Sequence, residues 1–191
     1  MNSLLNKLSI RNGLILAGIS AVITIILYII NPLMQYTNFV VPILTIVIII
    51  ALFVILGIDI RRNLGGYWSF GQAFISLLIM SVIVLVVGIL INFVIFKFVD
   101  PTMPTKVNDA LLNVTTQRLE KMGMEQDKID EATKPFTDGE TIAKMQPTLV
   151  NELKAFGWAL LFYAVLDLII AACIKKNPPM FAPVSDQEII E

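Results

Sequence analysis

The chain has 191 residues, of which 57% are hydrophobic and 15% are charged, and its formal net charge is −1. A soluble domain averages about 45–50% apolar and about 25% charged residues, so the composition excludes an ordinary soluble domain. The sequence has no histidine and a single cysteine, which excludes histidine-dependent triads, cysteine-rich zinc sites and an internal disulfide. The balanced charge leaves no basic surface for nucleic acid.

Four apolar blocks predict four membrane-spanning helices, at residues 13–30, 39–58, 73–96 and 156–174. Each block is close to or above the ~20 residues that cross the hydrocarbon core of a bilayer. The first block follows Lys7 and Arg11 and ends without a small-residue cleavage site, so it predicts an uncleaved signal anchor. The sequence therefore predicts an all-α integral membrane protein with four transmembrane helices.

The polar segment 97–154 separates the third and fourth blocks and predicts a short helical insert. Apolar residues in its first part recur at helical spacing, and Gly123 then predicts a helix end. Residues 125–132 predict a second short helix, and Pro135 and Asp138-Gly139 predict further breaks in the chain. A last helix is expected to begin near Pro147 and to continue into the fourth span.

The distribution of basic residues predicts the orientation in the membrane. Lysine and arginine flank the first span, fill the second loop and follow the fourth span, at Lys7, Arg11, Arg61, Arg62, Lys175 and Lys176. The first loop, 31–38, has no charge at all. Because cytoplasmic loops are enriched in Lys and Arg, we expect both termini and the second loop in the cytoplasm and the insert outside. The expected location is a bacterial cytoplasmic (inner) membrane.

Asp167 is the one charged residue within the fourth block. An ionisable residue inside a membrane helix is a functional-site hypothesis by default. Small residues at seven-residue spacing lie along the same helix face, at Gly157, Ala164 and Ala171. This seam predicts that Asp167 faces the other helices, where Ser20 or Ser81 could donate a hydrogen bond. Asp167 is then either a group that handles a proton or cation, or a protonated carboxyl with one interhelical hydrogen bond. The second interpretation is favoured, because no second buried charge accompanies Asp167.

The segment 65–72, G-G-Y-W-S-F-G-Q, predicts a tight turn followed by a helix start. Ser69 and Gln72 have the spacing of a capping box, in which each side chain accepts a hydrogen bond from a free backbone N–H. The alternative is an anion or lipid-headgroup site at the same helix start, with Arg61 and Arg62 nearby. The capping role is favoured, because it explains the residues without a ligand.

Three further features predict packing rather than chemistry. Tyr67 and Trp68 suit the water–lipid interface. Gly13, Ala17 and Ala21 form a stripe of small residues along the first helix, which predicts a helix-packing surface. Cys173 is expected to be a small buried apolar residue.

Several short motifs resemble an uncharacterised four-helix membrane family, domain of unknown function 4199, found mostly in Bacteroidetes. They are G-L-I-L at 13–16, G-Y-W-S-F-G-Q-A-F at 66–74, F-V-D-P at 98–101 and M-G-M-E-Q-D at 122–127. The resemblance covers nearly the whole chain. Because the family has no assigned activity, it implies a membrane location and a four-helix architecture, with no catalytic residues.

These observations favour a non-enzymatic membrane protein with a structural or interaction role. Its expected partners are the lipid bilayer and either a second copy or another membrane protein, with no nucleic acid. The alternative is a small oligomeric transporter or proton-coupled carrier that uses Asp167. A membrane enzyme is the third and least favoured hypothesis, because no pair of carboxylates lies near one membrane depth. Nucleotide-binding motifs are absent from the sequence, and no cofactor is expected.

Overall fold

The computed structural model describes residues 3–177, and nearly all of that part is helical. Four helices are long and apolar enough to cross a membrane: α1 (Ser3–Ile30), α3 (Val40–Asn63), α4 (Phe70–Val94) and α8 (Leu149–Ile174). A short helix, α2 (Met34–Thr37), lies in the first loop, and α4 continues into a π-helical turn, η1 (Ile95–Val99). The prediction of an all-α membrane protein with four spans is confirmed.

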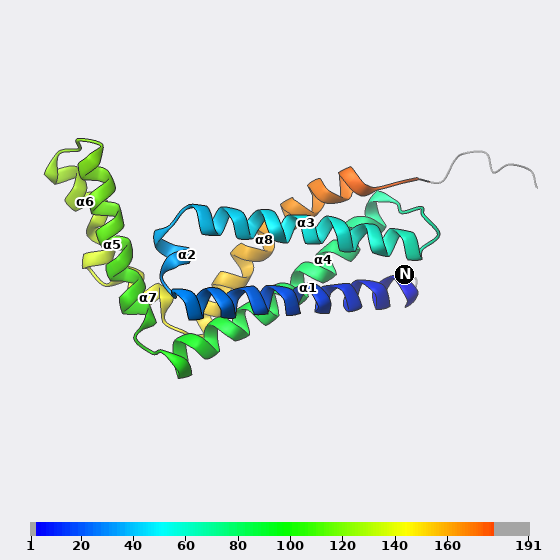
Figure 1. Cartoon of the computed structure of the whole chain (residues 1–191), viewed down its shortest axis with the longest axis horizontal. Coiled ribbons are helices and arrows are strands. Elements are labelled where there is room, and N and C mark those ends of the chain that lie inside the picture. The colour runs from blue at the N-terminus through cyan, green and yellow to red at the C-terminus, as the bar shows by residue number, and fades with distance from the viewer. Residues whose placement is uncertain (1–2, 178–191) are drawn as a thin grey trace, which may run out of the picture.

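The insert between η1 and α8 folds into three helices at one end of the spans (Figure 1). These are α5 (Met103–Lys121), α6 (Gln126–Thr137) and α7 (Glu140–Met145). Helix α5 ends just before Gly123, as predicted. The predicted break at Pro135 is wrong, because α6 continues through this residue, whereas the break predicted at Asp138-Gly139 is confirmed by the turn before α7. A proline near the last turn removes a single backbone hydrogen bond, which a helix end tolerates.

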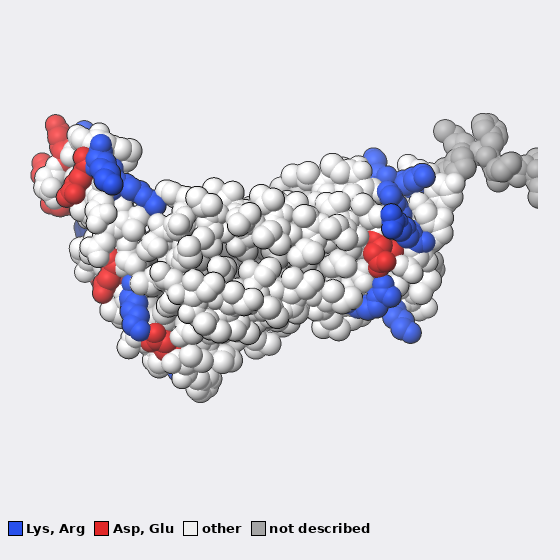
Figure 2. Space-filling view, viewed as in Figure 1, with Lys and Arg blue, Asp and Glu red and all other residues white. Residues whose placement is uncertain are grey.

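The charged side chains lie at the two ends of the molecule (Figure 2). One charged end belongs to the insert, and the other lies where α1 begins and where the last described residues are (Figure 1). The surface between them carries no Lys, Arg, Asp or Glu on the face shown. An uncharged band bounded by charged ends is what a bilayer requires of a multi-pass protein.

The four spans pack tightly in only one half of this band, which we call the closed half. Their buried residues lie within Leu5–Ala17 of α1, Ile49–Ile60 of α3, Ala73–Leu85 of α4 and Asp167–Ile174 of α8. Helix α4 is central, because both α1 and α8 pack mainly against it. A Cβ at Gly13 would lie 3.1 Å from the Cα of Met80, so the glycine allows α1 to approach α4 closely. With Ala17 buried beside it, the predicted packing stripe is confirmed for these two residues.

The half nearer the insert, which we call the open half, is more loosely packed. Helix α8 packs against other spans in its C-terminal part, and its N-terminal part exposes Trp158 by 77%. The prediction that Gly157 lies in a close helix contact is wrong, because no heavy atom lies within 4 Å of a Cβ placed there. The small residues continue along α8 to Gly157, but no other helix packs closely against them there.

Cys173 is exposed, so the prediction that it is buried is wrong. It follows buried Ala171 by two residues, and with 3.6 residues per turn such a pair points to nearly opposite sides of a helix. The face of α8 that meets α4 therefore turns Cys173 outward.

Candidate functional site

Asp167 and Ser81 form a buried hydrogen bond between α8 and α4. The Ser81 hydroxyl donates to Asp167 Oδ2 at 2.7 Å, and neither residue has any exposed surface. The predictions that Asp167 faces the bundle and that a hydroxyl satisfies it are therefore confirmed. The partner is Ser81 rather than Ser20, whose hydroxyl donates to Leu16 O in its own helix at 2.8 Å.

The second oxygen of Asp167, Oδ1, has no hydrogen-bond partner among residues 3–177. Oδ2 accepts the hydrogen bond from Ser81, and Oδ1 can carry a proton. The protonated side chain is then uncharged, and Ser81 still donates to it. The pair can therefore hold α4 and α8 together without placing a charge inside the bilayer.

Ser69 and Gln72 form the predicted capping box at the start of α4. The Gln72 N–H donates to the Ser69 hydroxyl at 3.4 Å, and the Ser69 N–H donates to Gln72 Oε1 at 3.2 Å. These bonds satisfy two backbone donors that a helix start otherwise leaves free. The residues thus fix the point at which the chain enters the membrane again.

The tight turn before this helix start depends on Gly65 and Gly66. Their φ angles are +85° and +87°, a backbone region that residues with a Cβ rarely adopt. The Gly66 N–H donates to Arg61 O at 3.0 Å, and the Gly65 N–H donates to Arg62 O at 3.2 Å. This pair of bonds is the Schellman motif, which closes the C-terminus of α3.

Loss of the capping hydroxyl should have a modest effect. Replacing Ser69 by alanine should lower the free energy of unfolding by about 1 kcal/mol, and Ser69→Asp should lower it less, because aspartate also caps. Reversible unfolding in mixed micelles, followed by circular dichroism, measures both values. Equal losses for the two variants would contradict the capping role.

Trp68 is completely buried, so the prediction that it lies at the water–lipid interface is wrong. The backbone N–H of Trp68 donates to Lys176 O at 2.7 Å and the Trp68 carbonyl accepts from the Lys176 N–H at 2.9 Å, which forms an antiparallel bridge. The bridge fixes the backbone after α8 against the turn before α4. The indole then packs toward Gly57, where a Cβ would lie 3.7 Å from the ring. Tyr67, for which the same position was predicted, is 44% exposed.

The two arginines near the turn have different environments. Arg61 Nη1 donates to Ile174 O at 2.8 Å, so its cation lies at the C-terminal end of α8. The free carbonyls at a helix C-terminus carry partial negative charge, which makes this contact favourable. Arg62 is exposed. The structure thus places Arg61 as a tie between α3 and α8 and does not bring the two arginines together at the capping box.

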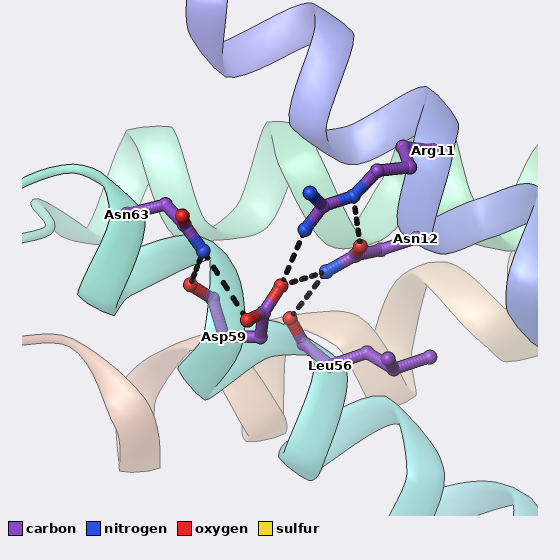
Figure 3. Close-up of polar contacts among 5 residues, drawn as sticks. All are labelled: Arg11, Asn12, Leu56, Asp59 and Asn63. Atoms are coloured by element: carbon purple, nitrogen blue, oxygen red, sulfur yellow. Dashed lines mark hydrogen bonds and ion pairs between the residues drawn. The ribbon is translucent and has the colours of Figure 1, made fainter.

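A polar cluster that the sequence did not reveal joins α1 to α3 (Figure 3). Arg11 Nη2 donates to Asp59 Oδ2 at 2.7 Å. The buried Asn12 amide donates to the same oxygen at 2.9 Å and to Leu56 O at 3.0 Å. The Asn63 amide donates to the backbone oxygen of Asp59 at 2.8 Å.

In this cluster, the hydrogen bonds of buried Asn12 are expected to contribute more to the stability of the fold than the ion pair. The Arg11 and Asp59 side chains are 52% and 42% exposed, and exposed ion pairs contribute about 0–1 kcal/mol. The sequence signal was a basic residue before one predicted span and an acidic residue after the next. Because two successive spans cross in opposite directions, both residues lie at the same end of the spans, but only the packing of α1 against α3 brings them into contact.

Comparison with known proteins gives one match. No curated protein and no solved structure matches the chain. A family model described as a protein of unknown function (DUF4199) matches residues 11–176. The matched range includes the Ser81–Asp167 pair, the capping box and the Arg11 cluster, and it covers most of the chain. The protein therefore belongs to the DUF4199 family, whose function is unknown, and its four apolar helices make it a multi-pass membrane protein.

Proposed function

We propose that this protein is a non-enzymatic protein of the bacterial cytoplasmic membrane, with a structural or partner-binding role. The observation that carries the proposal is the buried hydrogen bond from Ser81 to Asp167. It gives the single acidic group deep in the spans a partner on another helix, so a packing role accounts for it without a ligand or a reaction. Asn12 and Arg61 likewise join different spans.

The insert supports a role in partner binding. Met122 and Met124 lie at the turn between α5 and α6, away from the spans, and are 68% and 43% exposed (Figure 1). Methionine side chains are flexible and polarizable, and they are common on surfaces that bind other proteins. The partners that we propose are the lipid bilayer and, at the insert, a second copy or another membrane protein.

We propose further that both termini and the turn before α4 face the cytoplasm. The basic residues Arg11, Arg61 and Lys176 all belong to the end of the molecule opposite the insert, which supports this orientation. The insert then lies on the outer side.

Cysteine labelling tests the orientation. In a Cys173→Ala background, Asn31→Cys and Asp127→Cys should react with a membrane-impermeant maleimide added to intact cells. Asn63→Cys should react only after the cells are opened. Labelling of Asp127→Cys that requires opened cells would reverse the assignment.

The alternative function, a small oligomeric transporter or proton-coupled carrier, is favoured by one specific observation. Asp167 Oδ1 is unpartnered, and Tyr163, one helical turn away, lines a cavity between the spans. A carboxyl near such a cavity could exchange a proton with it if the packing around Ser81 opened.

The variant Asp167→Asn distinguishes the two functions. Its amide oxygen can still accept from Ser81, so the variant should keep the thermal stability of the wild type. Asp167→Leu should lose about 0.6–1.7 kcal/mol of unfolding free energy, as interhelical hydrogen bonds in membranes do. In liposomes, neither the wild type nor Asp167→Asn should conduct protons. Proton flux in the wild type that disappears in a stable Asp167→Asn variant would overturn the structural role and support the carrier.

A further inference from the structure

Two neighbouring cavities run from the insert into the open half. The inner cavity, about 280 Å³, lies between the four spans and α2, and its polar wall consists of Ser20, Thr24, Gln35, Thr45, Asn92 and Tyr163. The outer cavity, also about 280 Å³, lies between α4, α7 and α8, where Lys144 and Glu152 line it. Ile89 and Asn92 line both cavities. Because they share this wall, we treat the two as one vestibule.

The polar wall of the inner cavity presents mainly hydrogen-bond acceptors. The hydroxyls of Ser20, Thr24 and Thr45 each donate to a backbone carbonyl of their own helix, at 2.8, 3.0 and 2.9 Å. A hydroxyl that has donated its proton keeps oxygen lone pairs and can only accept. The Asn92 amide nitrogen donates to Gly88 O at 3.1 Å, which leaves its oxygen free to accept as well. The wall therefore suits a ligand that donates hydrogen bonds.

The charges at the mouth also favour a cation. Lys144 is paired with Glu140 at 2.7 Å, whereas Glu152 forms no ion pair within residues 3–177. Lys97, which lines an adjacent groove with Glu152, lies over the Phe93 ring at 4.9 Å from its centroid. Both lysines thus have contacts of their own, with Glu140 or with the Phe93 ring, whereas Glu152 has no ion-pair partner within residues 3–177. Tyr163 also lines the inner cavity, and aromatic rings attract cations.

We infer that the vestibule is a water-filled binding site for a small organic ammonium compound that enters from the insert side. The ammonium group meets Glu152 first and then the acceptor oxygens of the inner cavity. The site ends one helical turn short of Asp167, so it does not depend on proton exchange there. The inference goes beyond the proposed structural or partner-binding role and stands or fails separately from it.

Reaction rates of engineered thiols test the vestibule. In a Cys173→Ala background, the full chain is placed in lipid nanodiscs, where both membrane faces are accessible. Thr45→Cys should react with water-soluble methanethiosulfonates. Leu44→Cys is the matched control at nearly the same depth, because Leu44 is 56% exposed on the outside of α3 and should face lipid. Equal protection of the two thiols would show that no water-filled cavity exists and would overturn the inference.

Charge selectivity tests the ligand class. The aminoethyl reagent, a cation, should modify Thr45→Cys at least about tenfold faster than the sulfonatoethyl reagent, after correction for their rates with a free thiol. Glu152→Gln should remove most of this preference, whereas Glu120→Gln, a change on α5 outside the vestibule, should not. Millimolar propylammonium should slow the labelling, and propanol should not. A preference for the anionic reagent, an unchanged preference in Glu152→Gln, or equal effects of propylammonium and propanol would each overturn the assignment.

Discussion

Trp68→Ala should lower the free energy of unfolding by about 3 kcal/mol, near the lower end of the range for removing a buried aromatic side chain. The indole is completely buried and packs beside Gly57, so its removal leaves a cavity that the fixed backbone on both sides cannot close. The lower end of the range applies because an apolar side chain that moves from lipid into a membrane protein gains less from the hydrophobic effect than one that moves out of water. The main loss is therefore of packing contacts.

The same residue type provides the control. Trp158 is 77% exposed, and Trp158→Ala should change the unfolding free energy by less than about 0.5 kcal/mol. The chain has two tryptophans, so each variant leaves one fluorophore to report unfolding. Similar losses for the two variants would contradict the buried position of the Trp68 side chain.

Gly13→Leu should be at least as damaging, with a loss of about 3 kcal/mol or more, since overpacking commonly costs about 1–3 kcal/mol even where side chains can adjust. A Cβ at this position would lie 3.1 Å from the Cα of Met80, and a backbone atom cannot move aside as a side chain can. Helix α1 would have to separate from α4, which would also weaken the contacts of Asn12 with α3.

Gly18→Leu is the matched control for this variant, since it makes the same change in the same helix. A Cβ at Gly18 would meet no heavy atom within 4 Å, so this variant should keep the fold. The yield of monodisperse protein and its thermal transition midpoint measure both effects. A stable Gly13→Leu variant would show that α1 and α4 do not pack as closely as described.

The four spans could be predicted from sequence because a bilayer restricts the possibilities. An uncharged apolar run of sufficient length has almost no alternative to a membrane helix. The helices nevertheless extend beyond the apolar blocks, as α8 does by beginning at Leu149. Apolar composition identifies the part of each helix that lies in the hydrocarbon core. The backbone hydrogen bonds of the helix continue beyond that part into the polar region. The capping box could also be predicted, since Ser69 and Gln72 are three residues apart and bond to each other's backbone.

The remaining features depend on how the helices cross, which one sequence does not determine. The seam of small residues predicted correctly that Asp167 faces the other helices, but it could not show that α8 joins them only after Gly157. Tryptophan is a residue type common at the membrane interface. The side chain of Trp68 is buried in the protein instead, next to the backbone bridge to Lys176. Arg11 and Asp59 lie 48 positions apart, so their contact follows from the packing of α1 against α3.

The difference between the two halves of the spans determines where lipid contributes to the fold. In the closed half, the helices bury residues such as Phe53 and Leu77 against one another. In the open half, no residue is buried in α1 after Ala17, in α3 before Ile49 or in α8 before Asp167. Acyl chains of the leaflet beside the insert therefore take the place of neighbouring helices there. For this half, annular lipid is a packing material, and its chain length and order set how far apart the helices stand. Exchange of that lipid for short-chain surfactant should disturb this leaflet's half of the protein first and leave the Ser81–Asp167 contact until last.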